Sequence, residues 1–129
     1  MGQHSGKVII PSGADVWPHE LACARTLATA GYTVEFLRRT SGDRVKSADI
    51  VMNGVAWEIK APKTSNLKHL QLTLRRAAKQ SPNVIIDSTR LHAIPDQSVE
   101  KELRRLKPLV RSVKRLLLVT KSRKVIDIR

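Results

Sequence analysis

Hydrophobic and polar residues alternate on both sides of Asn53-Gly54, and this pattern predicts a β-hairpin. Asn-Gly favours a two-residue hairpin turn because both turn residues must adopt positive φ angles. One face of the predicted hairpin is entirely apolar, and its members are Ile50, Met52, Val55, Trp57 and Ile59. This face is expected to join a hydrophobic core.

The other face of the hairpin contains charged side chains. Because the turn pairs Met52 with Val55, a continued ladder places Asp49 opposite Glu58. Lys60 follows two residues later and projects from the same face. Like charges that face each other across a ladder destabilise it unless a positive charge lies between them, and a divalent cation often supplies it. The pattern predicts a metal site held by Asp49 and Glu58, with Lys60 beside it.

A helix is expected before the hairpin, because Pro18 and Gly31 bracket an apolar stripe in the usual order. Glu20 lies at the edge of this stripe that faces the core. The lone Cys23 is expected to be a buried apolar residue of this helix. Residues 32–37 are expected to form a strand, and residues 38–46 a polar, basic loop.

After the hairpin, Thr64 or Ser65 is expected to cap a second helix that runs to about Gln80, although either hydroxyl could instead contact a phosphate. Residues 83–87 (NVIID) are typical of a buried strand. A third helix is expected to begin at Asp96 as its cap, and Pro108 should end or kink it.

Two final strands are expected over residues 113–120 and 125–128. The order is α-β-β-β-α-β followed by α-β-β, which indicates a single mixed α/β domain over residues 1–129. Residues 1–14 are expected to be a flexible N-terminal segment. No apolar run approaches the ~20 residues of a membrane helix.

Charge is unevenly distributed along the chain. The net charge is +13, yet residues 61–129 contain 17 Lys and Arg against 5 Asp and Glu. A basic half beside a carboxylate site indicates a polyanion partner. With only four aromatic residues, base stacking is disfavoured and phosphate contacts would dominate. A single cysteine excludes an internal disulfide and a cysteine-based zinc cluster.

The arrangement of Asp49, Glu58 and Lys60 between two helices resembles the PD-(D/E)XK nuclease superfamily, whose core is αβββαβ. The resemblance covers about residues 18–88 and implies a restriction-endonuclease-like fold with a central mixed sheet. It implies that Asp49 and Glu58 bind the metal, that Lys60 is the motif lysine and that Glu20 is the acid of the first helix. Ala48 stands where the family usually has proline.

A longer stretch, GDRVKSADIVMNGVAWEIKAPKTS with the basic helix and AAKQSPNVIID, is similar to the C-terminal toxin domain of contact-dependent growth inhibition proteins (CdiA), in its tRNA nuclease branch. This implies a metal-dependent endoribonuclease that cleaves tRNA in a neighbouring bacterium. It also implies secretion as the C-terminal part of a larger exoprotein, action in the target-cell cytoplasm, and an immunity protein, which we expect to be acidic. Mg²⁺ is the expected cofactor, with Mn²⁺ or Zn²⁺ as alternatives.

In this interpretation, polar and basic side chains that follow the hairpin contact the substrate, and they are Lys63, Thr64, Ser65, Lys68, Gln71, Arg75, Arg76 and Lys79. Either Gln71 or Arg75 occupies the polar position that the superfamily has on its second helix. Two alternatives stay open. One is a DNA nuclease or resolvase-like enzyme with the same core, because the metal site treats RNA and DNA phosphates alike. The other is a non-catalytic nucleic-acid-binding module.

Overall fold

The computed structural model describes residues 6–38 and 48–129. Within them, the expected order of helices and strands is confirmed, with one additional strand at the start. The elements are β1 (Val8–Ile9), α1 (Pro18–Thr29), β2 (Val34–Phe36), β3 (Ile50–Met52), β4 (Val55–Lys60), α2 (His69–Ala78), β5 (Asn83–Asp87), α3 (Asp96–Leu106), β6 (Arg115–Val119) and β7 (Val125–Ile128). The basic loop expected over residues 38–46 lies, apart from Arg38, outside the described residues.

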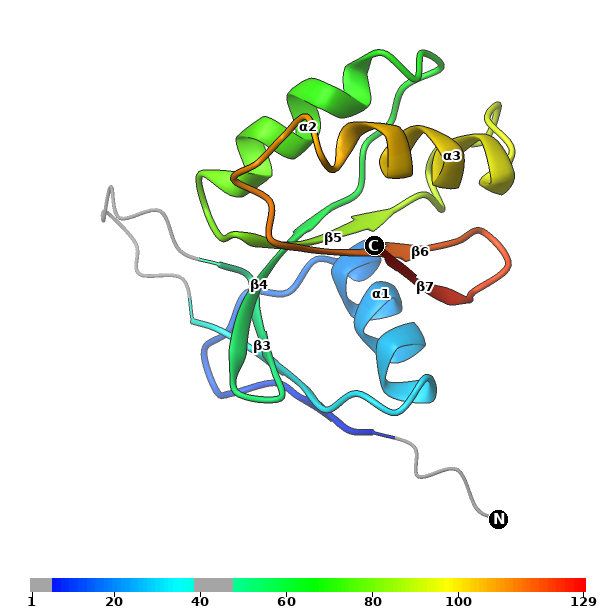
Figure 1. The fold of residues 1–129 in the computed structure, drawn as a ribbon. Helices are drawn as coiled ribbons and strands as arrows, with labels where there is room; N and C mark the ends of the chain where they lie inside the picture. Colours follow the sequence, from blue (N-terminus) through cyan, green and yellow to red (C-terminus); the bar gives the residue numbers. More distant parts are fainter. Residues whose placement is uncertain (1–5, 39–47) are drawn as a thin grey trace.

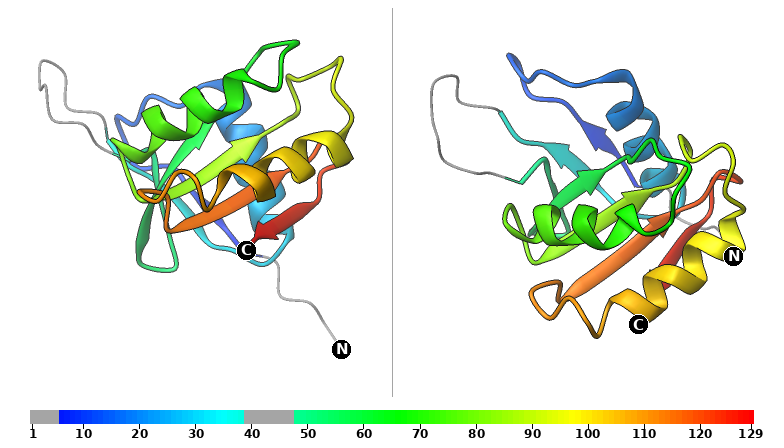
Figure 2. Two further views of the ribbon diagram at one scale, coloured as in Figure 1. Left: turned by 45° about the horizontal axis from the view of Figure 1, so that its top comes forward. Right: turned by 90° about the horizontal axis from the view of Figure 1, so that it is seen from above.

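The strands form one mixed sheet in sequential order from β1 to β7. Three neighbouring pairs are parallel, namely β1–β2, β4–β5 and β5–β6. Parallel neighbours need a crossover connection, and α1, α2 and α3 supply the three crossovers. Figures 1 and 2 show a curled sheet with α2 and α3 over one face and α1 against the other. In the described part of the chain, no helix is long and apolar enough to cross a membrane.

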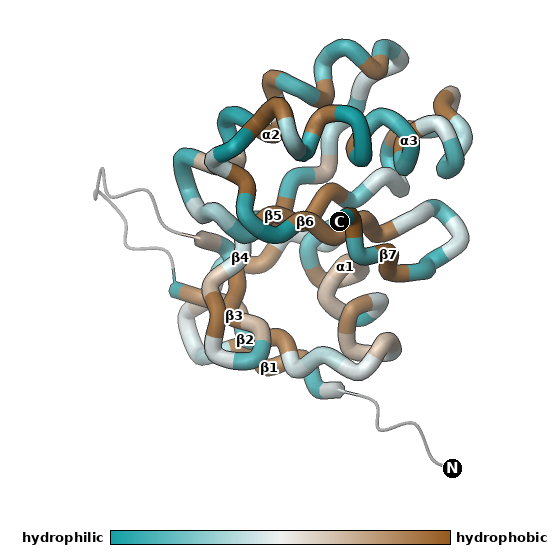
Figure 3. Tube along the Cα trace, in the orientation of Figure 1, coloured by the Kyte–Doolittle hydropathy of each residue, from teal (hydrophilic) through white to brown (hydrophobic). Residues whose placement is uncertain are grey.

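The sheet separates two hydrophobic cores. Val84 and Ile86 of β5 pack beneath α2 and α3, whereas Ile85 packs with Trp57 and Leu27 on the α1 side. Because β5 is covered on both faces, its apolar run is continuous rather than alternating. Figure 3 shows that apolar residues are concentrated in the strands at the centre, whereas α2 and α3 contain many polar residues.

The expectation of a flexible segment over residues 1–14 is corrected for residues 6–9, which attach to the sheet. Gly6 N–H donates to the Ala28 carbonyl at 2.7 Å, and Val34 N–H donates to the Lys7 carbonyl at 2.7 Å. A Cβ atom at Gly6 would lie 1.6 Å from the Tyr32 carbonyl oxygen, so only glycine fits this approach.

The predicted cap of α2 is also corrected, since the helix begins at His69 and not directly after Thr64 or Ser65. Thr64 Oγ1 accepts a hydrogen bond from Asn66 N–H at 3.1 Å, and Asn66 Oδ1 accepts one from Lys68 N–H at 3.0 Å. These short side chains satisfy backbone donors of the loop, and the helix therefore starts later.

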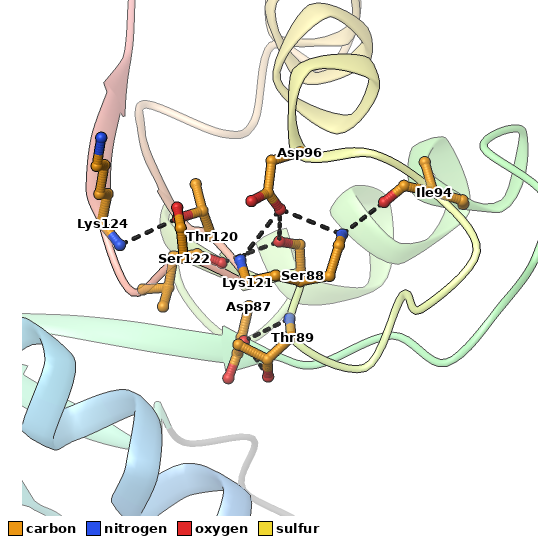
Figure 4. A network of polar contacts seen from close by, with 10 residues as sticks. Asp87, Ser88, Thr89, Ile94, Asp96, Thr120, Lys121, Ser122 and Lys124 are labelled. Atoms are coloured by element: carbon orange, nitrogen blue, oxygen red, sulfur yellow. Dashed lines mark hydrogen bonds and ion pairs between the residues drawn. The ribbon is translucent and has the colours of Figure 1, made fainter.

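A polar network joins the start of α3 to the ends of β5 and β6 (Figure 4). Asp96 was expected to be a cap, but Pro95 has that position. Asp96 Oδ1 instead accepts hydrogen bonds from Lys121 N–H at 3.0 Å and Ser88 Oγ at 3.2 Å, and it lies 3.1 Å from Lys121 Nζ. Partial burial alone would raise the pKa of Asp96, but the Lys121 and Ser88 contacts hold it below its usual value.

Asp96→Ala should destabilise the fold by about 1–3 kcal/mol at neutral pH, because it leaves the groups around Asp96 without their acceptor. For a domain of this size the melting temperature should fall by roughly 3–10 °C in thermal unfolding monitored by circular dichroism. Because the pKa of Asp96 is lower in the folded than in the unfolded state, the Asp96 carboxylate stabilises the fold at pH values above its unfolded pKa. The stability difference between Asp96→Ala and wild type should therefore shrink as the pH falls toward 3. The control is Asp127→Ala, which removes an exposed acid of β7, and equal melting temperatures for the two variants would contradict the network's role.

Candidate active site

The turn that orients the candidate site is the predicted one. Asn53 and Gly54 have φ angles of 51° and 78°. The ladder pairs Met52 with Val55 and Ile50 with Trp57, which confirms the predicted register for these residues. The apolar face of the hairpin packs in the α1-side core, as expected.

Asp49 lies just beyond the regular end of β3. Its N–H donates to the Trp57 carbonyl at 3.0 Å, so the pairing departs by one residue from the continued ladder. Its Oδ2 atom accepts a hydrogen bond from Ile59 N–H at 2.9 Å. Backbone and side chain together hold Asp49 against β4, beside Glu58 rather than in strict register with it.

Glu58 is the buried member of the candidate site, with only 5% of its surface exposed. It pairs with Val84 of β5, and its side chain therefore lies on the α2 side of the sheet. Glu58 Oε2 is 3.3 Å from Lys60 Nζ. Glu58 Oε1 is buried and has no hydrogen-bond partner in the described part of the chain.

The pKa of Glu58 is raised to about 8 by burial, by the negative charge of Asp49 and by a hydrogen bond with the Asp49 carboxyl group, while Lys60 acts in the opposite direction. Two carboxyl groups this close cannot both ionise at low cost without a positive partner. Lys60 supplies part of this compensation, and a shared proton or a divalent cation would supply more.

Glu20 is buried, as expected, but the structure shows a structural role for it. Its Oε1 atom accepts a hydrogen bond from Trp17 N–H at 3.0 Å and so caps α1. α1 covers the face of the sheet opposite to Glu58. Among residues 6–38 and 48–129, no three His, Cys, Asp or Glu side chains gather closely enough to hold a metal ion.

Cys23 of α1 lies in the α1-side core, and its thiol pKa reflects its surroundings. Cys23 is fully buried, and burial raises the pKa of its thiol far above the usual value. The carboxylates of Asp87, Glu20 and Asp49 raise the pKa further, whereas Arg123 lowers it.

Sequence reasoning missed Asp87, the last residue of β5. It is fully buried, and its Oδ1 atom accepts hydrogen bonds from Thr89 N–H at 2.9 Å and Thr89 Oγ1 at 2.7 Å. Its Oδ2 atom has no hydrogen-bond partner in the described part of the chain. The sequence signal that could have identified Asp87 is an acid at the end of an apolar strand. Functional groups tend to lie at the carboxyl ends of parallel strands.

The predicted nucleic-acid-binding residues lie on the loop after β4 and on α2. Most are exposed, namely Lys63, Ser65, Lys68, Arg75, Arg76 and Lys79, while Thr64 and Gln71 are half-buried. Thr64 Oγ1 also lies 2.8 Å from His69 Nδ1. Neither Gln71 nor Arg75 forms a hydrogen bond or an ion pair with Glu58 in the described part of the chain, so the choice between these two stays a prediction.

Comparisons with known proteins place the chain in a family. No curated protein matches it. The solved CdiA-CT/CdiI toxin and immunity complex from Burkholderia pseudomallei contains a chain with the same fold, with a TM-score of 0.73, 19% sequence identity, and coverage of 96% of this chain and 99% of that chain. The family model of the contact-dependent growth inhibition CdiA C-terminal domain matches residues 46–125, which is more than half of the sequence. The chain belongs to the CdiA C-terminal domain family of contact-dependent growth inhibition toxins.

Proposed function

We propose that this domain is a metal-dependent nuclease that cleaves tRNA, with a site of the PD-(D/E)XK type. The observation that carries the proposal is the carboxyl pair of the half-buried Asp49 and the buried Glu58, with Lys60 Nζ 3.3 Å from Glu58. A purely structural hairpin gains nothing from two acids in contact, because their repulsion destabilises it.

The residues fit a divalent cation. Glu58 Oε1 is a buried acceptor without a hydrogen-bond partner among the described residues, and carboxylate oxygens are ligands that Mg²⁺ prefers. Asp49 and Glu58 would hold the cation, which supplies a Lewis acid for the phosphate and acidifies bound water. We propose Glu20 as a further contributor through water, a role compatible with its hydrogen bond from Trp17 N–H.

Lys60 has the position to act on the reacting phosphate. It is half-exposed, so its ammonium group can approach a substrate and neutralise charge that develops on the phosphate oxygens, or orient the attacking water. The basic side chains of the loop after β4 and of α2 would bind other phosphates of the substrate backbone.

The family supports a proposal for the partner and the delivery of this domain. The structural relative is a toxin in complex with its immunity protein. We propose that an acidic immunity protein blocks this domain in the producing cell. The domain would be delivered as the C-terminal part of a larger exoprotein and would act in the cytoplasm of a target bacterium.

The purified chain should cleave bacterial tRNA in Mg²⁺ and lose this activity in EDTA. Asp49→Ala and Glu58→Ala should each lower the rate of tRNA cleavage at least roughly 100-fold, because each removes a carboxylate that would hold the cation. Lys60→Gln should lower the rate by a similar factor, because it removes the positive charge beside the reacting phosphate. Gel analysis of tRNA and of plasmid DNA gives the rates, with Glu35→Gln, an exposed acid of β2, as the control. Wild-type rates for Asp49→Ala would reject the site, and cleavage of DNA alone would favour the DNA nuclease.

The ends of the products report which nucleophile reacts. Attack by water leaves a 5′-phosphate and a 3′-hydroxyl, whereas attack by the ribose 2′-hydroxyl leaves a 2′,3′-cyclic phosphate. We expect the first set, because the carboxyl pair and Lys60 suit activation of water. End-labelling of the fragments distinguishes the two, and cyclic ends formed in EDTA would refute the mechanism.

Glu58→Gln should change how stability depends on pH in metal-free buffer. The folded-state pKa of about 8 exceeds the unfolded value of 4.5, so Glu58 stabilises the fold least when it is ionised. Between pH 5 and pH 9, the free energy of unfolding of wild type should fall by about 1–3 kcal/mol relative to that of Glu58→Gln. This corresponds to roughly 3–10 °C in melting temperature. Mg²⁺ at pH 8 should raise the melting temperature of wild type alone. Parallel pH curves for the two proteins would show that Glu58 is not held in this environment.

A further inference from the structure

A shallow groove crosses the outer surface of α2 at its C-terminal half. Its volume is about 550 Å³, and it is lined by Leu72, Arg75, Arg76, Ala78, Lys79 and Ser112. We call it the α2 groove. Five of these residues belong to α2 or its end, but Ser112 comes from the connection between α3 and β6, which contributes the second wall.

The second wall is fixed in place by buried residues and by the backbone. Val110 and Val113 pack in the core beneath α2 and α3, while Arg111, Ser112 and Lys114 are exposed. The N–H groups of Lys114 and Arg115 both donate to the Pro82 carbonyl, at 2.7 Å and 3.3 Å, in the turn after α2. Two basic segments that are distant in sequence therefore lie side by side.

The charge of the groove is not compensated by nearby acids in the sequence. Residues 59–86 and 103–126 contain no Asp or Glu. None of the ion pairs found in the described part of the chain involves Arg75, Arg76 or Lys79. On α3 the arrangement is different, because Arg104 pairs with Glu100 at 2.9 Å and Arg105 with Glu102 at 2.8 Å.

The groove also lies away from the carboxyl pair along the strands. After α2, Ser81 Oγ and Asn83 Nδ2 donate to the Ala56 carbonyl near the start of β4, whereas Lys60 ends that strand. A polyanion bound in the groove would therefore extend past the phosphate that reacts. Contacts made there would contribute to binding more than to the chemical step.

We propose that the α2 groove binds the phosphate backbone of the nucleic acid at a distance from the cleaved bond, with the α3–β6 connection as the second wall. This rests on the proposed nuclease function and extends its substrate contacts to Arg111, Ser112 and Lys114. The groove suits a phosphate chain better than a protein surface, because three cations surround a single exposed apolar side chain, Leu72. The core of a protein interface is apolar and poor in lysine.

The test measures binding of fluorescein-labelled bacterial tRNA to the full chain with Asp49→Ala, which prevents cleavage. Adding Arg75→Ala, Arg76→Ala and Lys79→Ala should weaken binding roughly 10–100-fold near 0.1 M salt and reduce the slope of log K against log salt by about 2–3. Arg111→Ala with Lys114→Ala should reduce the slope by about 1–2. With Asp49 restored, Arg76→Ala with Lys79→Ala, and Arg111→Ala with Lys114→Ala, should raise KM for tRNA cleavage and change kcat less than roughly threefold.

The matched control removes three cations from α3 with Lys101→Ala, Arg104→Ala and Arg105→Ala. It should retain tRNA affinity within roughly threefold, because two of the three already pair with acids. Equal weakening by the α2 and α3 variants would indicate a net-charge effect and overturn the groove. Unchanged tRNA binding by the α2 variants would also overturn the proposed role of the α2 groove. The proposed nuclease function would still hold in that case if wild type cleaves tRNA.

Poly-glutamate is the probe for a protein partner. Binding of poly-glutamate as tight as that of tRNA, lost in the same α2 variants, would reassign the groove to an acidic polypeptide. If instead the α2 variants lose tRNA binding but wild type cleaves no nucleic acid, the groove stands and the proposed nuclease function fails.

Discussion

The turn at Asn53-Gly54 is the constraint on which the candidate site depends. Its two positive φ angles fix the register of β3 against β4, and side chains of a strand alternate between faces. A slip of one residue would move Glu58 into the α1-side core and Trp57 to the opposite face. β5 then holds β4 in place from its other edge by parallel pairing. A two-residue turn thus determines which layer of the fold receives the charges.

Features set by local rules could be predicted from the sequence. The hairpin, the apolar strand of residues 83–87 and the order of elements from α1 to β7 all follow from turn chemistry and periodicity. The burial of Glu20 and of Cys23 followed from the stripe of α1. The same rules brought Asp49 and Glu58 together, although a local departure from the ladder changes how Asp49 reaches its neighbour.

Features that depend on distant partners could not be predicted. β1 has two residues, too few for any periodicity, and exists because β2 pairs with it. Glu20 caps α1 through Trp17, a residue type that gives no capping signal. The approach of the α3–β6 connection to α2 depends on the Pro82 carbonyl. Under the proposed nuclease function, substrate choice would depend on such surfaces, since a carboxyl pair would treat RNA and DNA phosphates alike.

Trp57 and Trp17 give the protein two built-in optical probes of its candidate site. Trp57 precedes Glu58 and is 1% exposed, and the Arg115 guanidinium lies 4.9 Å from its ring centre. Trp17 is 53% exposed, and its backbone N–H donates a hydrogen bond to Glu20. Buried indole rings emit at shorter wavelength than hydrated ones. The fluorescence spectrum therefore separates into a component from the sheet beside Glu58 and one from the start of α1. A change in packing around β4 or at the start of α1 can therefore be followed without an added label.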